Sequence, residues 1–497
     1  MFYTSTRDKS VRVTSAQAIT MGISKDGGLF VPQEIPKLSV SDIESLAKLD
    51  YIGRAKSILS MYLTDFTQEE LDKCVNGAYK KGKFSSDAIA PLVDLDDETQ
   101  VLELWKGPTC AFKDMALQLL PYLLTTASKK AAPGKQIVIL VATSGDTGKA
   151  ALEGFKDVGG TKILVFYPND GVSEMQKLQM TTQEGDNVSV CAIVGNFDDA
   201  QSGVKSIFTN KEIKKKLEQS NMMFSSANSI NWGRLVPQIV YYVSAYCDMV
   251  SKGKLKNGDP MNVVVPTGNF GNILAAYYAK KMGVPIGKLI CASNANNVLT
   301  DFLNTGKYDR KRAFYTTSSP SMDILISSNL ERLLFDLCGK DDDKVNSWMS
   351  ALAKDGAYDV GEDMLAKVKE LFCAGFCDDD GVQLSIKETF ENNNYLCDTH
   401  TAVAVNVCGQ YKKNTGDKTP TIIVSTASPY KFSKSVLQAL QPVSNDLDDF
   451  EISDVLAKKT DTQIPPQLAQ LKSKQVRFNQ VCEKDTMEQQ VFNMLKI

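Results

Sequence analysis

The sequence predicts an α/β protein in which a mostly parallel sheet carries helices on both faces, with a small N-terminal helical domain before it. From about residue 96, short apolar runs alternate with turns rich in Gly, Ser and Thr and with amphipathic segments, which is the pattern of strand, loop and helix. The clearest strands are the apolar runs 137–142, 262–266 and 421–425. At 497 residues, the chain has room for roughly three domains and for a cleft between lobes.

The N-terminal part is predicted from helix start signals. Ser39 or Ser41 stands before one segment with apolar positions at helical spacing, and Thr67 stands before another. Each of these side chains can cap a helix. We therefore place an N-terminal domain at residues 1–95 and the main region at 96–497.

Composition excludes several classes of function. The 56 Lys and Arg residues nearly balance the 59 Asp and Glu residues, which gives no electrostatic case for nucleic-acid binding. His400 is the only histidine, so a multi-histidine metal centre is excluded, and we expect no metal. Two acidic runs, near residues 340 and 377, are expected to lie in solvated loops.

Cysteine usage and apolar patterning predict where the protein works. None of the eleven cysteines forms a Cys-x-x-Cys pair, which is typical of reduced thiols in a cytosolic protein. The first ten residues lack the profile of a secretory signal, and no apolar run approaches the roughly 20 residues that span a bilayer. We expect a cytoplasmic protein with no membrane partner.

A glycine-rich loop follows the apolar run 262–266. In GNFGN, residues Gly268 to Asn272, two glycines stand where the backbone has to fold tightly before a helix that starts at Ile273. Free amides and the dipole at a helix start attract anions, so this loop is a candidate phosphate site. A turn that needs its glycines for conformation alone is the alternative.

A second polar loop, Ser144 to Gly148, follows the apolar run 137–142, and its hydroxyls and amides suit a carboxylate. It differs from a nucleotide-binding P-loop at Thr143, where glycine is required, and at Ala150, where Ser or Thr is required. No G-x-G-x-x-G follows a strand, so dinucleotide redox chemistry has no support.

Lys113 starts an apolar-periodic helix directly behind Phe112. A lysine is electrostatically unfavourable at the positive end of a helix, and the dipole together with partial burial would lower its pKa. A free amine of this kind can form a Schiff base. An ordinary surface lysine is the alternative, and the residues by themselves leave both open.

Several motifs are spread along nearly the whole chain, and GPT-x-AFKD and SMDI-x-ISSN-x-ERLLF are the most specific of them. They are Tyr3 with the STR of residues 5–7, DGGLFVP (26–32), GPTCAFKD (107–114), TSGDTG (143–148), NSINWGRL (228–235), TGNFGN (267–272), SMDILISSNLERLLF (321–335) and DTHTAV (398–403). In this order and spacing, the motifs resemble those of the threonine synthase family, which belongs to the fold-type II pyridoxal-phosphate enzymes.

The resemblance implies a fold and a cofactor. It implies two open, mostly parallel α/β lobes within the catalytic region 96–497, the smaller at roughly 125–210 and the larger in the remainder. Pyridoxal 5'-phosphate would form a Schiff base with Lys113, and the hydroxyl of Thr426 would face the pyridine nitrogen, with Ser425 or Ser428 as the alternative. The residues implied to hold the cofactor phosphate are Gly268, Asn269, Phe270, Gly271 and Asn272.

The resemblance further implies conversion of O-phospho-L-homoserine and water to L-threonine and phosphate, the last step of threonine biosynthesis. Lys113 would be the catalytic residue that moves protons at Cα and Cβ. A forked guanidinium suits the phosphate of the substrate. The residues implied in substrate binding are Ser229, Asn231 and Arg234 at the phosphate, and Ser144, Asp146 and Thr147 at the carboxylate and cofactor ring.

Two other functions stay open on the same resemblance. A threonine synthase-like lyase would eliminate phosphate and release 2-oxobutyrate. A non-catalytic protein on the same fold is less favoured, because it needs no second phosphate pocket. The sequence does not distinguish a monomer from a homodimer.

Three positions depart from the family's pattern. Lys106 and Ser428 stand where the family often has histidine, so a histidine role at those positions does not carry over. His400 lies in DTHTAV, where Thr399 replaces a proline, and both a structural role at a helix start and a catalytic role are open.

Overall fold

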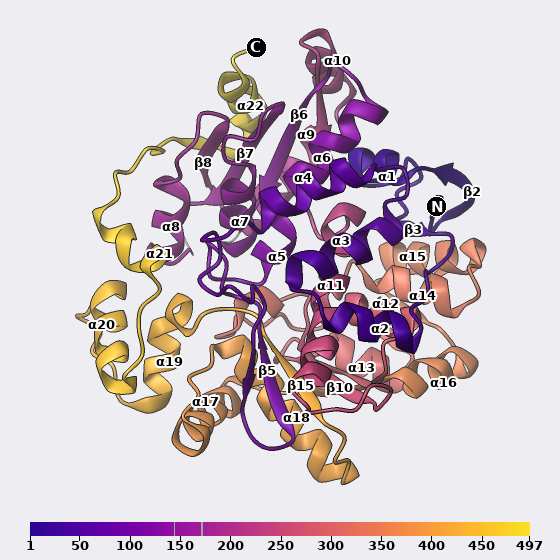
Figure 1. Ribbon diagram of the computed structural model, residues 1–497. Helices are drawn as coiled ribbons and strands as arrows, with labels where there is room; N and C mark the ends of the chain where they lie inside the picture. Colours follow the sequence, from indigo (N-terminus) through magenta and orange to yellow (C-terminus); the bar gives the residue numbers. More distant parts are fainter. Residues whose placement is uncertain (144, 170–171) are drawn as a thin grey trace.

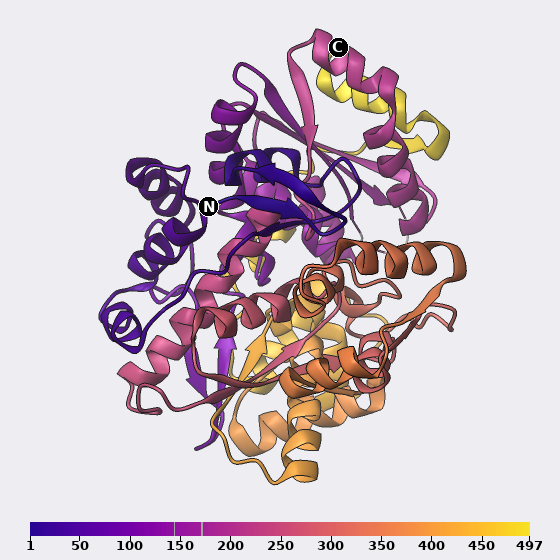
Figure 2. The same cartoon turned by 90° about the vertical axis from the view of Figure 1, so that its right-hand side faces the viewer.

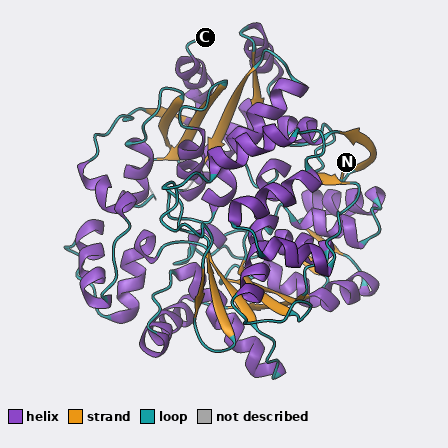
Figure 3. Cartoon of the chain, in the orientation of Figure 1, coloured by secondary structure: helices purple, strands orange, loops and turns teal. Residues whose placement is uncertain are grey.

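The computed structural model describes residues 1–143, 145–169 and 172–497. Two separate sheets, one mostly and one entirely parallel, form the centres of two lobes, with helices packed around both (Figures 1 and 3). The α/β class and the two-lobed arrangement expected from the sequence are confirmed.

The larger lobe is built on a six-stranded sheet with the strand order β14-β11-β10-β15-β5-β4. Neighbouring strands are parallel except β4 and β5, which form an antiparallel pair. The central strands β10 and β15 are fully buried, which explains their continuous apolar sequence. The strands are β4 (Leu92–Asp94), β5 (Thr99–Glu103), β10 (Met261–Pro266), β11 (Ile286–Ser293), β14 (Phe372–Phe376) and β15 (Thr421–Ser425).

The smaller lobe is built on a five-stranded parallel sheet with the strand order β16-β8-β7-β6-β9. This sheet extends beyond the expected range 125–210, because β9 follows that range and β16 comes from the C-terminal part of the chain. Its strands are β6 (Gln136–Ala142), β7 (Thr161–Pro168), β8 (Val188–Val194), β9 (Met222–Ser225) and β16 (Val481–Glu483).

The N-terminal region contains the expected helices and a small sheet that the sequence patterns did not predict. Ser39 and Thr67 cap their helices, each in a capping box, and β4 joins the sheet of the larger lobe. The elements are β1 (Tyr3–Ser5), α1 (Ser15–Met21), α2 (Val40–Ala47), α3 (Tyr51–Tyr62) and α4 (Gln68–Ala78), with β2 (Asp8–Val13) and β3 (Phe30–Pro32) flanking β1.

The helix α11 (Trp232–Ser251) is the buried centre of the molecule and contacts N-terminal helices as well as α5 and α12 (Figure 2). Helices near the smaller lobe are α5 (Lys113–Leu117), α6 (Leu120–Ala131), α7 (Asp146–Phe155), α8 (Glu174–Thr181), α9 (Phe197–Thr209) and α10 (Lys211–Gln219). Later helices are α12 (Gly271–Met282), α13 (Val298–Thr305), α14 (Leu330–Leu337), α15 (Asp342–Asp355), α16 (Glu362–Leu371), α17 (Asp379–Asn393), α18 (Thr399–Thr415), α19 (Ser433–Leu440), α20 (Asp449–Thr460), α21 (Pro466–Ala469) and α22 (Met487–Leu495).

Short elements complete the chain, and the C-terminal segment runs from the larger lobe back to the smaller one (Figure 1). On this path the guanidinium of Arg477 donates to the carbonyl of Gln183 at 2.8 Å. Among the described residues, no helix has both the length and the apolar character to cross a membrane. The short elements are β12 (Lys307–Asp309), β13 (Ala357–Asp359), η1 (Pro320–Met322), η2 (Pro429–Phe432), η3 (Gln470–Ser473) and η4 (Lys484–Thr486).

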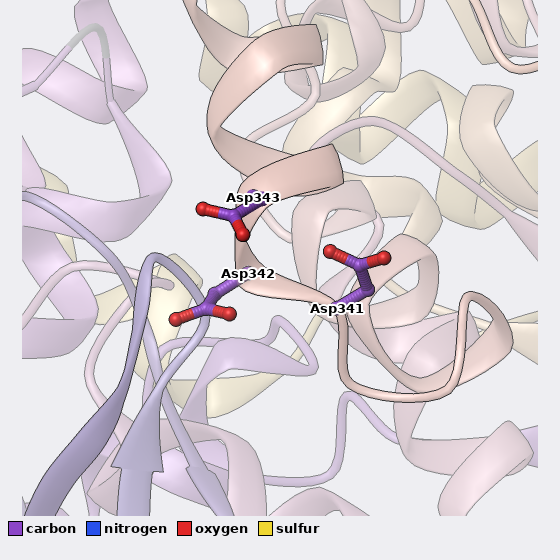
Figure 4. Close-up of side chains that lie close together, drawn as sticks. All are labelled: Asp341, Asp342 and Asp343. Carbon is purple, nitrogen blue, oxygen red and sulfur yellow. The ribbon is translucent and has the colours of Figure 1, made fainter.

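The two acidic runs start helices, contrary to the expectation that they lie in loops. Asp341 caps α15 and Asp378 caps α17, because carboxylates at a helix start satisfy free amides and complement the dipole. The carboxylates of Asp341, Asp342 and Asp343 lie close together (Figure 4). Asp342 pairs with Lys9 at 2.9 Å and Asp341 caps the helix, so these two carboxylates have structural partners.

Candidate functional site

The loop that carries Lys113 is attached to the end of strand β15. The backbone N–H of Phe112 donates to the carbonyl of Thr426 at 2.8 Å, and that of Ser428 donates to the carbonyl of Cys110 at 3.0 Å. These bonds join segments that lie more than 300 residues apart in the sequence. They place Lys113 at the carboxyl edge of the larger sheet, where ligands bind in open α/β folds.

Asp114 stabilises this loop from inside. Its carboxylate accepts from the backbone N–H of Thr109 at 2.8 Å and from the Thr109 hydroxyl at 2.7 Å, and burial raises the pKa of Asp114 to about 6. A Cβ at Gly107 would come within 2.5 Å of the same carboxylate, so this position requires glycine. Cys110 has a φ of 58°, a strained conformation for a residue other than glycine.

Lys113 is a buried residue, which excludes the alternative of a surface lysine. Its Nζ lies 3.4 Å from Oγ of Ser321 and 3.7 Å from Oδ2 of Asp146. Burial lowers the pKa of Lys113, the positive charges of Arg234 and Lys431 lower it further, and Asp146 opposes the shift. Burial is therefore the main cause of a more available amine.

Asp146 and Lys431 form a buried ion pair between the lobes, with Nζ and Oδ1 2.7 Å apart. The fully buried ammonium of Lys431 also donates to the carbonyl of Thr109 at 3.1 Å and to Gln179 at 3.3 Å. Although burial would raise it, Lys431 and Lys113 hold the pKa of Asp146 well below its usual range. Sequence reasoning missed Lys431; the signal was a lysine in the SPYKF segment just after strand β15.

This ion pair changes the role expected for Asp146. Its carboxylate faces two lysines and cannot donate a hydrogen bond to a substrate carboxylate. Thr147 is half-buried in the first turn of α7, beside Asp146, and stays a candidate for that contact. Ser144 lies outside the described residues.

The GNFGN loop is held by the segment that follows η1. The hydroxyl of Ser327 donates to the carbonyl of Gly268 at 2.7 Å, and the backbone N–H of Asn329 donates to the carbonyl of Asn269 at 3.1 Å. A Cβ at Gly268 would come within 2.9 Å of the Ser321 carbonyl. The residue with left-handed backbone is Phe270, at a φ of 62°, so Gly268 is needed for close approach and not for its φ angle.

The start of α12 presents unpaired donors. The first N–H groups of a helix have no partner within it, and here they belong to Gly271, Asn272 and the residue after them. The side-chain oxygen of Asn272 accepts from Tyr241 and Tyr242 at 2.6 Å each, whereas its buried Nδ2 has no partner among the described residues. A buried donor without a partner is costly, so this loop is suited to an anion.

Arg234 is a second anion-binding candidate. It is 6% exposed, and its Nη1 donates to the carbonyl of Ala227 at 2.9 Å. Burial alone lowers the pKa of Arg234 to about 10, and within the described part of the chain no carboxylate forms an ion pair with it. A buried cation without a counter-charge favours an anionic ligand.

The other two residues expected at the substrate phosphate differ in availability. Ser229 is half-buried, and its hydroxyl lies 3.4 Å from that of Ser328, next to the GNFGN loop. Asn231 is fully buried, and its side chain bonds to Gly233, Ile19 and Ser226. The side chain of Asn231 therefore positions the start of α11 and has no free donor for a ligand, whereas Asn228 is exposed.

Three hydroxyls were candidates at the edge of β15, and two of them have other partners. Ser425 accepts from the ring N–H of Trp105 at 3.0 Å, and its hydroxyl lies 3.1 Å from that of Thr401. Ser428 accepts from the backbone of Tyr430. Accepting a bond does not use the proton of a hydroxyl, so all three stay candidates for a donor, with Thr426 directly beside the Lys113 loop.

Lys106 and His400, which occupy atypical positions, both have partners. Lys106 pairs with Glu103 at 2.9 Å and lies over the ring of Trp105, so its charge is already compensated. Nδ1 of His400 lies 2.8 Å from Asp398, and Nε2 accepts from the backbone N–H of Ser321 at 3.1 Å. His400 thus contacts the site through Ser321 and does not reach Lys113 itself.

Three family models match the chain. They are "Threonine synthase N terminus" over residues 2–79, "Pyridoxal-phosphate dependent enzyme" over 99–364 and "Threonine synthase, C-terminal" over 401–491.

Individual proteins agree with these models. "Threonine synthase-like 1" from Homo sapiens is 41% identical over 437 residues, which are 86% of this chain and 58% of that protein, so the chain spans little more than half the length of that relative. A threonine synthase from Pseudomonas aeruginosa is 38% identical, over 88% of this chain and 90% of its own. The crystal structure of pyridoxal-phosphate-bound threonine synthase from Brucella melitensis superposes with a TM-score of 0.89 at 35% identity and covers 100% of both chains.

Proposed function

This chain belongs to the threonine synthase family of pyridoxal-phosphate-dependent enzymes, and we propose on that premise that it converts O-phospho-L-homoserine and water to L-threonine and phosphate. The observation that carries this proposal is the position of Lys113. Its buried amine, with a lowered pKa, lies among groups from both lobes, and the protein offers two separate anion-binding groups, the start of α12 and Arg234. A cofactor phosphate and a substrate phosphate need two such groups.

The residues of this chain fit pyridoxal phosphate. The buried Nδ2 of Asn272 lacks a partner among the described residues, and the first amides of α12 lie beside it. Gly268 leaves room where a Cβ would meet the Ser321 carbonyl. We assign the cofactor phosphate to the GNFGN loop and the pyridine nitrogen to the Thr426 hydroxyl.

When bound, pyridoxal phosphate supplies an aldehyde for amines and an electron sink that stabilises negative charge at neighbouring carbons. Lys113 Nζ would take the proton from Cα of the substrate and exchange protons at Cβ, which its lowered pKa favours. Asp146, held by Lys431, keeps a negative charge 3.7 Å from this amine. Arg234, with Ser229, would bind the substrate phosphate and stabilise its departure.

A second activity has specific support, because the 41% identical human relative carries the name "Threonine synthase-like 1". A lyase that releases 2-oxobutyrate would use the same Lys113 and Arg234. Incubation with O-phospho-L-homoserine and chromatography of the products tests the proposal. Threonine with equimolar phosphate supports the synthase, 2-oxobutyrate with phosphate supports the lyase, and absence of both in the cofactor-loaded protein supports a non-catalytic protein.

We also propose a cytoplasmic location and either a monomer or a homodimer. The sequence supports the first through its unpaired cysteines. Sedimentation of the purified protein distinguishes the two assembly states.

A further inference from the structure

The short helix η1 touches three parts of the site through one residue. Oγ of Ser321 lies 3.4 Å from Nζ of Lys113 and 3.5 Å from Oδ2 of Asp146. The Ser321 carbonyl lies against Gly268, where a Cβ would approach within 2.9 Å. A shift of this residue therefore changes the surroundings of Lys113 and the GNFGN loop together.

His400 holds Ser321 from the opposite side. Nε2 of His400 accepts the backbone N–H of Ser321 at 3.1 Å, while Nδ1 lies 2.8 Å from Oδ2 of Asp398. Asp398 is itself fixed as the N-cap of α18. The ring is 2% exposed and packs on Phe432 with 4.8 Å between ring centroids, so both of its nitrogens and one face have partners.

These contacts define the protonation of the ring. A nitrogen that accepts an N–H carries no proton, so Nε2 is unprotonated and Nδ1 donates its proton to Asp398. With Nε2 already occupied, the ring has no free base for a substrate.

We propose that His400 is a positioning residue, which as the neutral, Nδ1-protonated tautomer anchors the backbone of Ser321 and thereby keeps the Ser321 hydroxyl beside Lys113 and Asp146. The proposal rests on the proposed function only for its kinetic consequences, because the tautomer and the anchoring bond belong to the fold. It resolves the two roles that the sequence left open for His400 in favour of a structural one within the site.

The single histidine makes the tautomer directly measurable. In protein labelled with ¹⁵N-histidine, the ring gives one pair of nitrogen signals. We expect Nδ1 at the position of a protonated nitrogen and Nε2 at that of an unprotonated one at neutral pH, with no substrate present. A ring protonated at Nε2, alone or together with Nδ1, overturns the proposal.

Two substitutions test the anchoring bond. His400→Gln places a side-chain oxygen near the position of Nε2 and can still accept from Ser321, whereas His400→Asn places its polar group near Nδ1 and cannot reach. We expect His400→Asn to lower kcat by about tenfold or more, with KM changed less than about threefold, since the backbone of Ser321 loses the acceptor that holds it in place. We expect His400→Gln to recover most of that loss.

Thr401→Val is the matched control for loosening of α18. It removes a hydroxyl that donates to the same Asp398 but does not touch Ser321, so kcat should stay within about threefold of wild type. Equal kcat values for the Gln and Asn variants, or a loss in Thr401→Val as large as in His400→Asn, contradict the proposal. If wild-type protein makes no threonine, the proposed function fails, and the nitrogen signals still decide the role of His400.

Discussion

The two positively charged regions of the site differ in how their charge is compensated. Lys113 and Lys431 share the carboxylate of Asp146, which lies 3.7 Å and 2.7 Å from their amines. Arg234 is equally buried, yet burial alone determines its lowered pKa, and it has no ion pair among the described residues. A cluster whose charges are paired is stable without a ligand. A buried cation without a counter-charge is stabilised most when an anion binds to it.

The largest effect is expected at the reactive amine of the compensated cluster. Lys113→Ala should abolish turnover and the visible absorption of lysine-bound cofactor, because among the described residues no other lysine combines this location with a lowered pKa next to Ser321. The GNFGN loop should still bind the cofactor, though more weakly. Borohydride reduction followed by peptide mapping is the check, and label on another lysine of the active wild-type protein would contradict the assignment.

Arg234→Ala should distinguish the two charged regions most clearly, through its separate effects on activity and on stability. Loss of a charge-assisted contact costs about 1.5–3 kcal/mol, so kcat/KM for O-phospho-L-homoserine should fall roughly tenfold to over a hundredfold. The free energy of unfolding without ligand should change little, since the variant removes both a buried charge without a counter-charge and the bond from that side chain to the Ala227 carbonyl. Kinetics and denaturation measure these separately, and loss of cofactor with unchanged substrate affinity would mean that the two phosphate sites are exchanged.

Lys431→Met should show the opposite behaviour, because it leaves the buried carboxylate of Asp146 without its nearest partner. Breaking a buried ion pair costs about 3–5 kcal/mol of unfolding free energy. Lys434→Met, at an exposed position three residues later, is the control and should have little effect. If the loss is electrostatic, Asp146→Asn in the Lys431→Met background should recover part of it.

The ion pair of Asp146 and Lys431 also predicts how the stability of the fold depends on pH. The pKa of Asp146 is lower in the folded protein than its ordinary value, so its contribution to stability is present above the ordinary pKa of Asp and is lost as pH falls through the folded-state pKa. Denaturation between neutral and strongly acidic pH should show a smaller acid-induced loss in Lys431→Met than in wild type. An unchanged slope would show that other groups control acid unfolding.

The smallest effect is expected at Thr426. Thr426→Val keeps the shape and removes the hydroxyl, so cofactor should remain bound to Lys113 while its absorption spectrum changes and proton abstraction slows. Ser425→Ala tests the alternative hydroxyl, which bonds to Trp105 and Thr401. A change of spectrum in Ser425→Ala but not in Thr426→Val would move the nitrogen contact to Ser425.

Much of the fold could be predicted from the sequence, because apolar runs and helix caps are signals carried by a few neighbouring residues. The apolar runs became β6, β10 and β15, and Ser39 and Thr67 became helix caps. The sequence patterns missed the sheet of β1, β2 and β3 because its strands are only three to six residues long. They missed the membership of β16 in the smaller sheet because that pairing joins segments that are distant in the sequence. The acidic runs were misplaced in loops because a charge pattern does not distinguish a solvated turn from a helix start.

The sequence by itself determined the family, because its motifs are short and spread along the chain, and for the site it predicted Lys113 as the reactive lysine and two anion-binding loops. Only the tertiary structure decided which side chains are available. It pairs Asp146 with Lys431 across 285 positions of sequence, uses the amide of Asn231 inside the fold, and turns the ring of His400 toward Ser321. Whether a polar group meets a ligand or a neighbour depends on which segments fold against it, and motif spacing carries no information about that.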